Sequence, residues 1–127
     1  TVILAKNLHV PSTHNNLIIE GAGGCLVPLN DELLMIDLIP LFQAEVLLVS
    51  NLYLGSINHT LLTHEALASR KIKVRGLIFN GEENEESERA ILHYTGARCL
   101  LRIKKEIEIN RDVVRKYAAL LKKNWYG

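Results

Sequence analysis

Residues Glu45–Asn80, EVLLVSNLYLGSINHTLLTHEALASRKIKVRGLIFN, carry the pattern that most clearly predicts the fold class. It starts with Val46–Val49, a run that is apolar at every residue and is therefore typical of a strand covered on both faces. From Ser56, which we expect to cap a helix, apolar residues recur near helical spacing up to about Arg70. A third segment, Lys73–Asn80, again reads as a strand. Strand, helix and strand in this order predict a parallel sheet.

The same alternation continues on both sides of this stretch. It predicts an α/β fold, with a parallel sheet flanked by helices, in one domain that covers residues 1–127. Five of the seven residues in Glu82–Glu88 are glutamates, and a helix N-terminus favours such negative charge. The other expected elements are helices over Thr1–Leu8, Met35–Phe42, Ser87–Tyr94 and Asp112–Lys123, and strands over Leu17–Ile19 and Ala97–Ile103.

Composition narrows the class of protein. Lys and Arg number 15 and Asp and Glu 14, so the net charge of +1 argues against a protein that coats nucleic acid or anionic membranes. A hydrophobic fraction of 48% argues against disorder. Two cysteines, Cys25 and Cys99, exclude a disulfide-rich scaffold and a four-cysteine zinc site. No apolar run approaches the length of a membrane span and no signal pattern is seen, so we expect a cytoplasmic protein.

The most informative candidate site is Glu20-Gly21-Ala22-Gly23-Gly24, which directly follows the first expected strand. In open parallel sheets, ligands bind beyond the carboxyl ends of the strands. Three glycines allow the backbone amides to approach phosphate oxygens, and a carboxylate at a strand end suits Mg²⁺. A tight turn with a solvated glutamate explains the same residues. No G-x-x-x-x-G-K-[ST] phosphate-binding loop occurs in the chain.

Two further segments fall at the same edge of the expected sheet. Gly55-Ser56-Ile57-Asn58 opens a helix whose free amides can bind an anion, although an ordinary capped helix would look the same. Asn80 ends a strand, where its amide could read the edge of a nucleobase or serve turn chemistry. The five histidines form no metal-binding pattern, and the lysine pairs Lys104-Lys105 and Lys122-Lys123 read as solvated faces.

Taken together, these segments resemble dethiobiotin synthetase. Leu17–Pro28, LIIEGAGGCLVP, is similar to that family's E-G-A-G-G-x-x-x-P signature. Leu54–Thr63, LGSINHTLLT, is similar to its L-G-x-I-N-H-x-L-L-T segment, and Gly76–Asn80 fits farther along. The resemblance covers essentially the whole chain but only the C-terminal half to two thirds of the family's usual length. It implies a fold like that of P-loop NTPases, with the P-loop segment missing from this chain.

The family's reaction, as the resemblance implies, is ATP-dependent closure of a cyclic urea. Diaminopelargonic acid takes up CO₂ as a carbamate, ATP phosphorylates the carbamate, and the second amine closes the ring of dethiobiotin. Glu20 would then be a Mg²⁺ ligand, and Glu20, Gly23 and Asn80 would bind nucleotide, Asn80 at the adenine. Gly23 and Gly24, together with Gly55, Ser56, Ile57 and Asn58, would bind substrate, the last four reaching across a homodimer.

The chain departs from the family pattern at several places. The phosphate-binding loop and the lysine-bearing strand are not present, and Gly81-Glu82-Glu83 stands where an aspartate is usual. Arg102–Glu106 replaces a proline-containing adenine loop. We therefore assign no catalytic residue and expect no activity from the chain by itself. A non-catalytic dimerisation or regulatory module is the main alternative; a related amide- or ring-forming enzyme fits less well, because neither cysteine has a glutaminase context.

Overall fold

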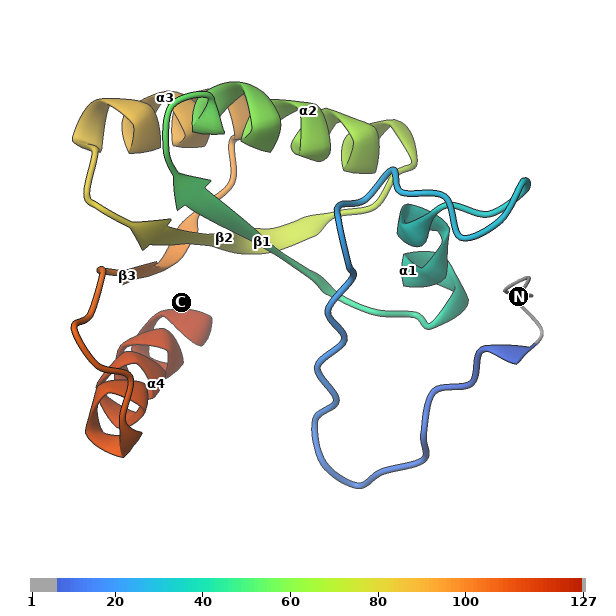
Figure 1. The fold of residues 1–127 in the computed structure, drawn as a ribbon, viewed down its shortest axis with the longest axis horizontal. Helices are drawn as coiled ribbons and strands as arrows, with labels where there is room; N and C mark the ends of the chain where they lie inside the picture. Colours follow the sequence, from blue (N-terminus) through green and yellow to red (C-terminus); the bar gives the residue numbers. More distant parts are fainter. Residues whose placement is uncertain (1–6, 127) are drawn as a thin grey trace. The chain divides into compact units, whose positions relative to one another are not determined.

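The computed structural model describes residues 7–126, so most of the helix expected over Thr1–Leu8 lies outside the described residues. The chain forms two compact units, Thr1–Ala44 and Glu45–Gly127. The second unit holds the sheet (Figure 1). Its elements are β1 (Val46–Leu52), α2 (Ser56–Ser69), β2 (Val74–Gly81), α3 (Glu85–Thr95), β3 (Cys99–Ile103) and α4 (Arg111–Trp125).

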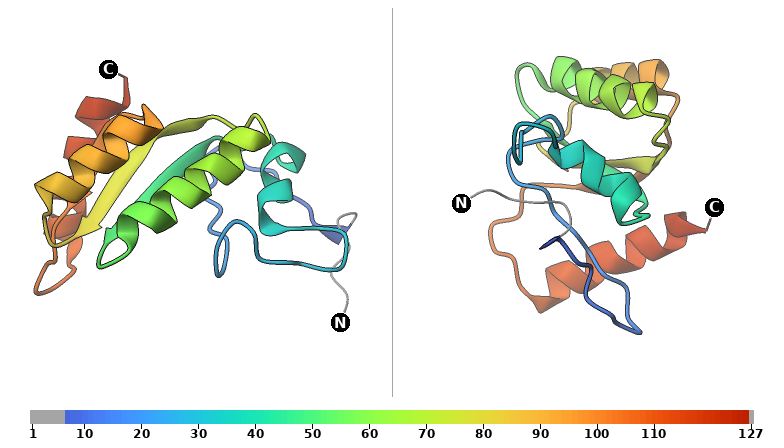
Figure 2. Two further views of the ribbon diagram at one scale, coloured as in Figure 1. Left: turned by 90° about the horizontal axis from the view of Figure 1, so that it is seen from above. Right: turned by 90° about the vertical axis from the view of Figure 1, so that its right-hand side faces the viewer.

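The three strands are parallel and follow each other across the sheet in the order β1-β2-β3. This confirms the predicted α/β fold with a parallel sheet. Helices α2 and α3 lie side by side on one face, and α4 packs on the other (Figures 1 and 2). The connections β1-α2-β2 and β2-α3-β3 cross the sheet in the same direction. Because such connections between parallel strands share one handedness, α2 and α3 lie on the same face of the sheet.

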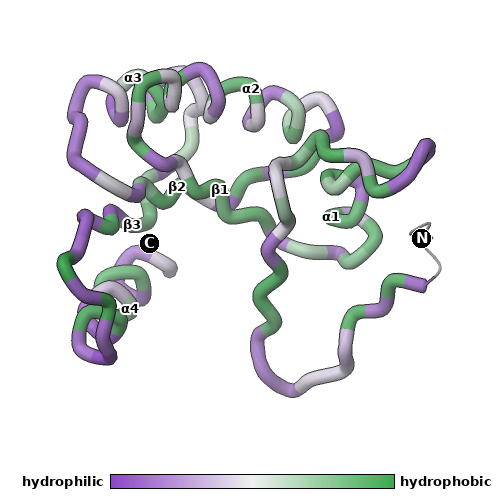
Figure 3. Tube along the Cα trace, in the orientation of Figure 1, coloured by the Kyte–Doolittle hydropathy of each residue, from purple (hydrophilic) through white to green (hydrophobic). Residues whose placement is uncertain are grey.

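Alternating residues of β2 fill two separate cores. Leu77 and Phe79 face α2 and α3, where they pack with Ile91. Ile78 faces α4 and packs with Leu101 and Tyr117. In Figure 3 the strands are mainly hydrophobic, whereas hydrophobic and hydrophilic residues alternate along α4. Because successive strand residues point to opposite faces, one apolar strand serves both layers.

Strand β1 is less buried than its sequence predicts. Leu47 is 37% exposed and Val49 56%, although both belong to an uninterrupted apolar run. Both lie on the face opposite Ser50, whose hydroxyl bonds to that of Thr60 on α2. The expectation that Val46–Val49 is covered on both faces is therefore wrong, because α4 packs along β3 and β1 is an edge strand.

Local capping sets where the helices begin. The Asn84 side chain accepts from the amide of Ser87 at the start of α3, and three glutamates lie in the first turn, as predicted. Asn110 caps α4 in the same way. At α2, however, the N-cap residue is Gly55 and not Ser56, which is already the first helical residue.

The C-terminal end of α4 is held at the amino ends of the strands. Nη2 of Arg98 donates to the carbonyl oxygen of Trp125 at 3.2 Å, and the Arg75 guanidinium lies 4.2 Å over the Trp125 ring. Arg75 also pairs with Glu45 at 2.8 Å. Cations at a helix C-terminus satisfy its last carbonyls and its negative dipole end, so these arginines fix α4 against the sheet.

Residues 7–44, the described part of the first unit, contain little regular structure. A 3-10 turn, η2 (Met35–Asp37), leads into α1 (Leu38–Leu41), which confirms the short helix expected here. Leu17–Ile19, in contrast, is not a strand, and Ile18 is 92% exposed. That prediction is wrong for a physical reason: a strand is stable only with a ladder partner, and within residues 7–44 this segment has none.

Candidate functional site

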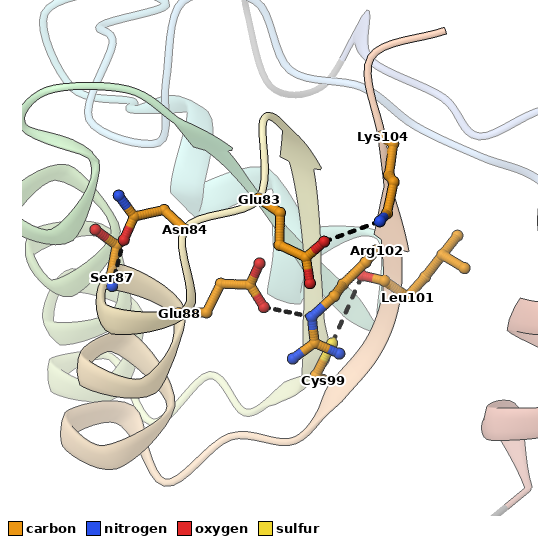
Figure 4. A network of polar contacts seen from close by, with 8 residues as sticks. All are labelled: Glu83, Asn84, Ser87, Glu88, Cys99, Leu101, Arg102 and Lys104. Carbon is orange, nitrogen blue, oxygen red and sulfur yellow. Dashed lines mark hydrogen bonds and ion pairs between the residues drawn. The ribbon is translucent and has the colours of Figure 1, made fainter.

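The carboxyl edge of the sheet carries a network of charged side chains (Figure 4). Glu88 of α3 is buried, with 4% exposed, and accepts a hydrogen bond from Nε of Arg102 on β3. Beyond the strand, Lys104 pairs with Glu83 at 2.8 Å. A small cavity at this edge is lined by Leu52, Phe79, Gly81, Glu83, Glu88, Arg102, Ile103 and Lys104. This is the edge at which open parallel sheets bind ligands.

The contacts within this network favour the charged forms of Glu83 and Lys104. The hydrogen bond and the positive charge of Lys104 lower the pKa of Glu83, and the same bond raises the pKa of Lys104. Burial raises the pKa of the Cys99 thiol, whose charged neighbours are Arg102 and Glu88. Cys99 is therefore protonated near neutral pH, which suits a packing residue and not a nucleophile.

Replacing Arg102 by Leu is expected to destabilise the protein by about 2–4 kcal/mol, because it leaves the buried Glu88 carboxylate without its cation. Urea unfolding followed by circular dichroism measures the change. Arg115→Leu, at a pair whose side chains are 70% and 90% exposed, is the matched control and should change stability by less than about 1 kcal/mol. Equal effects of the two substitutions would contradict a special role for Glu88.

Asn80 lies where the sequence predicted, at the carboxyl end of β2. Its Nδ2 donates to Oδ1 of Asn51 at 2.7 Å, and the two residues are register partners on neighbouring strands. Strand β1 continues through Asn51 to Leu52. Two carboxamides thus stand side by side at the edge of the sheet.

The predicted anion-binding segment Gly55–Asn58 forms the first turn of α2. Gly55 has φ +100°, a conformation that favours glycine, and no side chain caps the helix. The Ser56 amide is occupied, because it donates to the carbonyl oxygen of Tyr53 at 2.9 Å. Helix geometry gives the amides of Ile57 and Asn58 no partner within the helix, so this turn keeps donors for an anion.

The glycine segment belongs to the other unit. Glu20 is exposed, Gly23 and Gly24 have φ +83° and +127°, and Gly24 has open space where a side chain would stand. At Gly21 an added Cβ would lie 2.9 Å from Cγ of Met35. A side chain at Gly24 would therefore have open space, whereas one at Gly21 would meet the Met35 side chain.

The structure thus groups the predicted residues in two sets. Gly55–Asn58 and Asn80 share the sheet unit, whereas Glu20, Gly23 and Gly24 share the N-terminal unit. Sequence reasoning missed Glu88, Arg102 and Asn51. Glu88 and Arg102 lie far apart in the sequence and meet only in the folded chain. Asn51 could have been found from its place in the sequence, because Leu52 after it extends the apolar strand pattern and makes Asn51 a polar residue near the strand's end.

A second polar cluster ties α4 to the end of β3. The Tyr117 hydroxyl accepts from the amide of Lys104 at 3.0 Å and donates to Oε1 of Glu106 at 2.5 Å. Lys116 donates to the same oxygen at 3.0 Å. These two hydrogen bonds, that of Tyr117 first, lower the pKa of Glu106 below its ordinary value of 4.5.

Acidification is expected to weaken this connection. Since the pKa of Glu106 is lower in the folded protein, its contribution to stability is complete above about pH 4.5 and disappears as the pH falls through the folded value. Urea midpoints measured at about pH 7 and about pH 3.5 should therefore differ less in Glu106→Gln than in the wild type. An identical pH dependence in the two proteins would exclude Glu106 as a source of acid sensitivity.

Among residues 7–126, no three His, Cys, Asp or Glu side chains gather as a metal-binding group. Glu20 therefore offers a single carboxylate, which still fits Mg²⁺, because that ion commonly uses one or two carboxylates together with phosphates and waters. In the same described range, no helix is both long and apolar enough to cross a membrane.

Comparisons with known proteins agree with the resemblance found in the sequence. The AAA domain family matches residues 1–113. An ATP-dependent dethiobiotin synthetase of Cytophaga hutchinsonii is 57% identical over 98% of this chain and 61% of its own length. The enzymes of the same name from Christiangramia forsetii and Brucella ovis are 46% and 48% identical, over 93% and 72% of this chain and 56% and 43% of theirs. The matched part of the chain therefore spans about two fifths to three fifths of the length of these relatives.

Proposed function

Since the chain belongs to the AAA domain family and its curated relatives are dethiobiotin synthetases, we propose that it supplies the base- and substrate-binding part of such an enzyme. The relatives are ATP-dependent by name, which supports ATP as the co-substrate. The family match spans both compact units, which supports one domain over residues 1–127.

The proposed reaction closes a cyclic urea in three steps. One amine of diaminopelargonic acid adds to CO₂ and loses a proton, which gives a carbamate. A carbamate oxygen then attacks the γ-phosphorus of ATP, so that a mixed anhydride forms and ADP leaves. The second amine attacks the carbonyl carbon of that anhydride, inorganic phosphate leaves, and the ring of dethiobiotin closes. Such phosphoryl transfer depends on positioning and charge stabilisation more than on covalent chemistry by the protein.

The observation that carries this proposal is the uncapped first turn of α2 at the carboxyl edge of the sheet. The free amides of Ile57 and Asn58 suit the substrate's carboxylate, and we propose that Gly55, Ser56, Ile57 and Asn58 bind it together across a homodimer. The amide of Asn80 at the same edge suits the adenine base.

In the N-terminal unit, the residues proposed to bind metal, nucleotide or substrate are Glu20, Gly23 and Gly24. The exposed Glu20 would hold Mg²⁺, which, when bound, neutralises part of the triphosphate charge. The open backbone at Gly23 and Gly24 suits contacts with phosphate or substrate. Because this chemistry uses metabolites of the cell interior, we also propose a cytoplasmic location.

A chimera tests the proposal. This chain replaces the matching 61% of the Cytophaga hutchinsonii enzyme, and the purified product is assayed for dethiobiotin formation from diaminopelargonic acid, CO₂ and Mg-ATP. We expect the chimera to be active and the 127-residue chain alone to be inactive. A folded but inactive chimera would overturn the proposal and favour the non-catalytic module. Dethiobiotin formed by the chain alone would show that it needs no further segment.

A further inference from the structure

We propose that Asn51 is a positioning residue that fixes the carboxamide of Asn80 for recognition of an adenine base. This inference rests on the proposed function, which assigns Asn80 to the base. It adds a residue on a different strand, which touches Asn80 and acts through it.

The two amides lie side by side on neighbouring strands and share a hydrogen bond. Asn51 and Asn80 are paired in the parallel register of β1 and β2, and Nδ2 of Asn80 donates to Oδ1 of Asn51 at 2.7 Å. Asn51 is exposed and Asn80 is half-buried, so the pair lies at the surface of the carboxyl edge. Strand alternation puts both side chains on the face opposite Phe79, away from α2 and α3.

This hydrogen bond distinguishes the two ends of the Asn80 amide. A carboxamide has a carbonyl oxygen and two N–H groups, and its terminal torsion has two nearly equivalent orientations when nothing holds it. With one N–H donated to Asn51, the other N–H and the oxygen have no further hydrogen-bond partner among residues 7–126. Adenine presents a donor at N6 beside an acceptor at N7, and this edge matches the donor and acceptor that remain.

The neighbouring strand provides an apolar surface beside the pair. Ile103 is the register partner of Asn80 on β3 and packs with the apolar cluster on the α4 side. Ligand sites typically combine an apolar surface with a few placed polar groups, and a planar base needs both. Asn51, Asn80 and Ile103 form a row across the three strands. The two amides would bind the polar edge of the base, and Ile103 would contact its apolar face.

Nuclear magnetic resonance on the 127-residue chain tests the inference, with adenosine and guanosine as probes. The first readout needs no ligand, since the side-chain amide signal of Asn80 reports its bond to Asn51. Asn51→Leu should shift this signal towards that of a free amide, whereas Asn51→Asp should retain the bonded shift, because a carboxylate still accepts the N–H. Asn16→Leu, at an exposed position in the other unit, is the control.

The second readout is affinity. We expect adenosine to bind more tightly than guanosine, and Asn51→Leu to lower adenosine affinity about threefold to tenfold, through loss of pre-organisation. Asn51→Asp should keep most of the wild-type affinity. Loss of binding in Asn80→Ala with none in Asn51→Leu would overturn this inference and leave the proposed role of Asn80 intact. Adenosine binding that does not require Asn80, or no binding at all, would overturn both.

Discussion

Replacing Glu20 by Gln in the chimeric enzyme is expected to lower the affinity for Mg²⁺ by about tenfold to a hundredfold. Turnover at limiting Mg²⁺ should fall by a matching factor. The physical reason is that a neutral amide cannot replace the charge of a carboxylate on a hard divalent cation. Glu20 is exposed, and within the described residues no hydrogen bond or ion pair engages its carboxylate. Its loss should therefore leave folding unchanged.

Dethiobiotin formation measured over a range of Mg²⁺ concentrations separates this role from a structural one. Excess Mg²⁺ should restore part of the activity of Glu20→Gln, while the melting temperature stays at the wild-type value. Glu32→Gln, which removes another exposed carboxylate from the same unit, should behave like the wild type. Unchanged Mg²⁺ dependence in Glu20→Gln would remove Glu20 from the metal site.

Replacing Phe79 by Ala is expected to destabilise the sheet unit by about 3–5 kcal/mol, which is a large part of the stability of an ordinary domain. Phe79 is 1% exposed and packs in the core between the sheet and the helices α2 and α3. Its removal costs the transfer energy of the ring and leaves a cavity. The Arg102 guanidinium, 5.8 Å from the ring centre, loses a contact as well.

Urea unfolding of the 127-residue chain, followed by far-ultraviolet circular dichroism, measures this loss. The matched control is Val49→Ala on the neighbouring strand, because Val49 is 56% exposed and its truncation should cost less than about 1 kcal/mol. A comparable loss at both positions would contradict the assignment of the main core to the α2 and α3 face of the sheet.

Elements defined by a local pattern were predicted well. The helix at Met35–Phe42, the acidic start of α3 and the amphipathic α4 all follow from side chains within a few residues of each other. The parallel arrangement of the strands also followed, because alternating strands and helices leave little other choice. The positions of Gly55–Asn58 and Asn80 at the carboxyl edge were a consequence of that topology.

Predictions that depended on a distant partner were less successful. Leu17–Ile19 has the composition of a strand but lacks a ladder within the described N-terminal unit. Val49 has an apolar side chain suited to burial, but it lies on the edge strand β1, whereas α4 packs along β3. In both cases the side chains are suited to burial, and the neighbour that would bury them is not encoded nearby in the chain.

The sequence by itself determined the order and type of the elements in the sheet unit and the glycines and amides that end its strands, because backbone periodicity and capping act over short distances. The pairing of Arg102 with the buried Glu88, and the hydrogen bond from Asn80 to Asn51, become visible only in the folded chain. Those pairs join separate elements: the register of β1 and β2 brings Asn51 beside Asn80, and the position of α3 over the sheet brings Glu88 to Arg102.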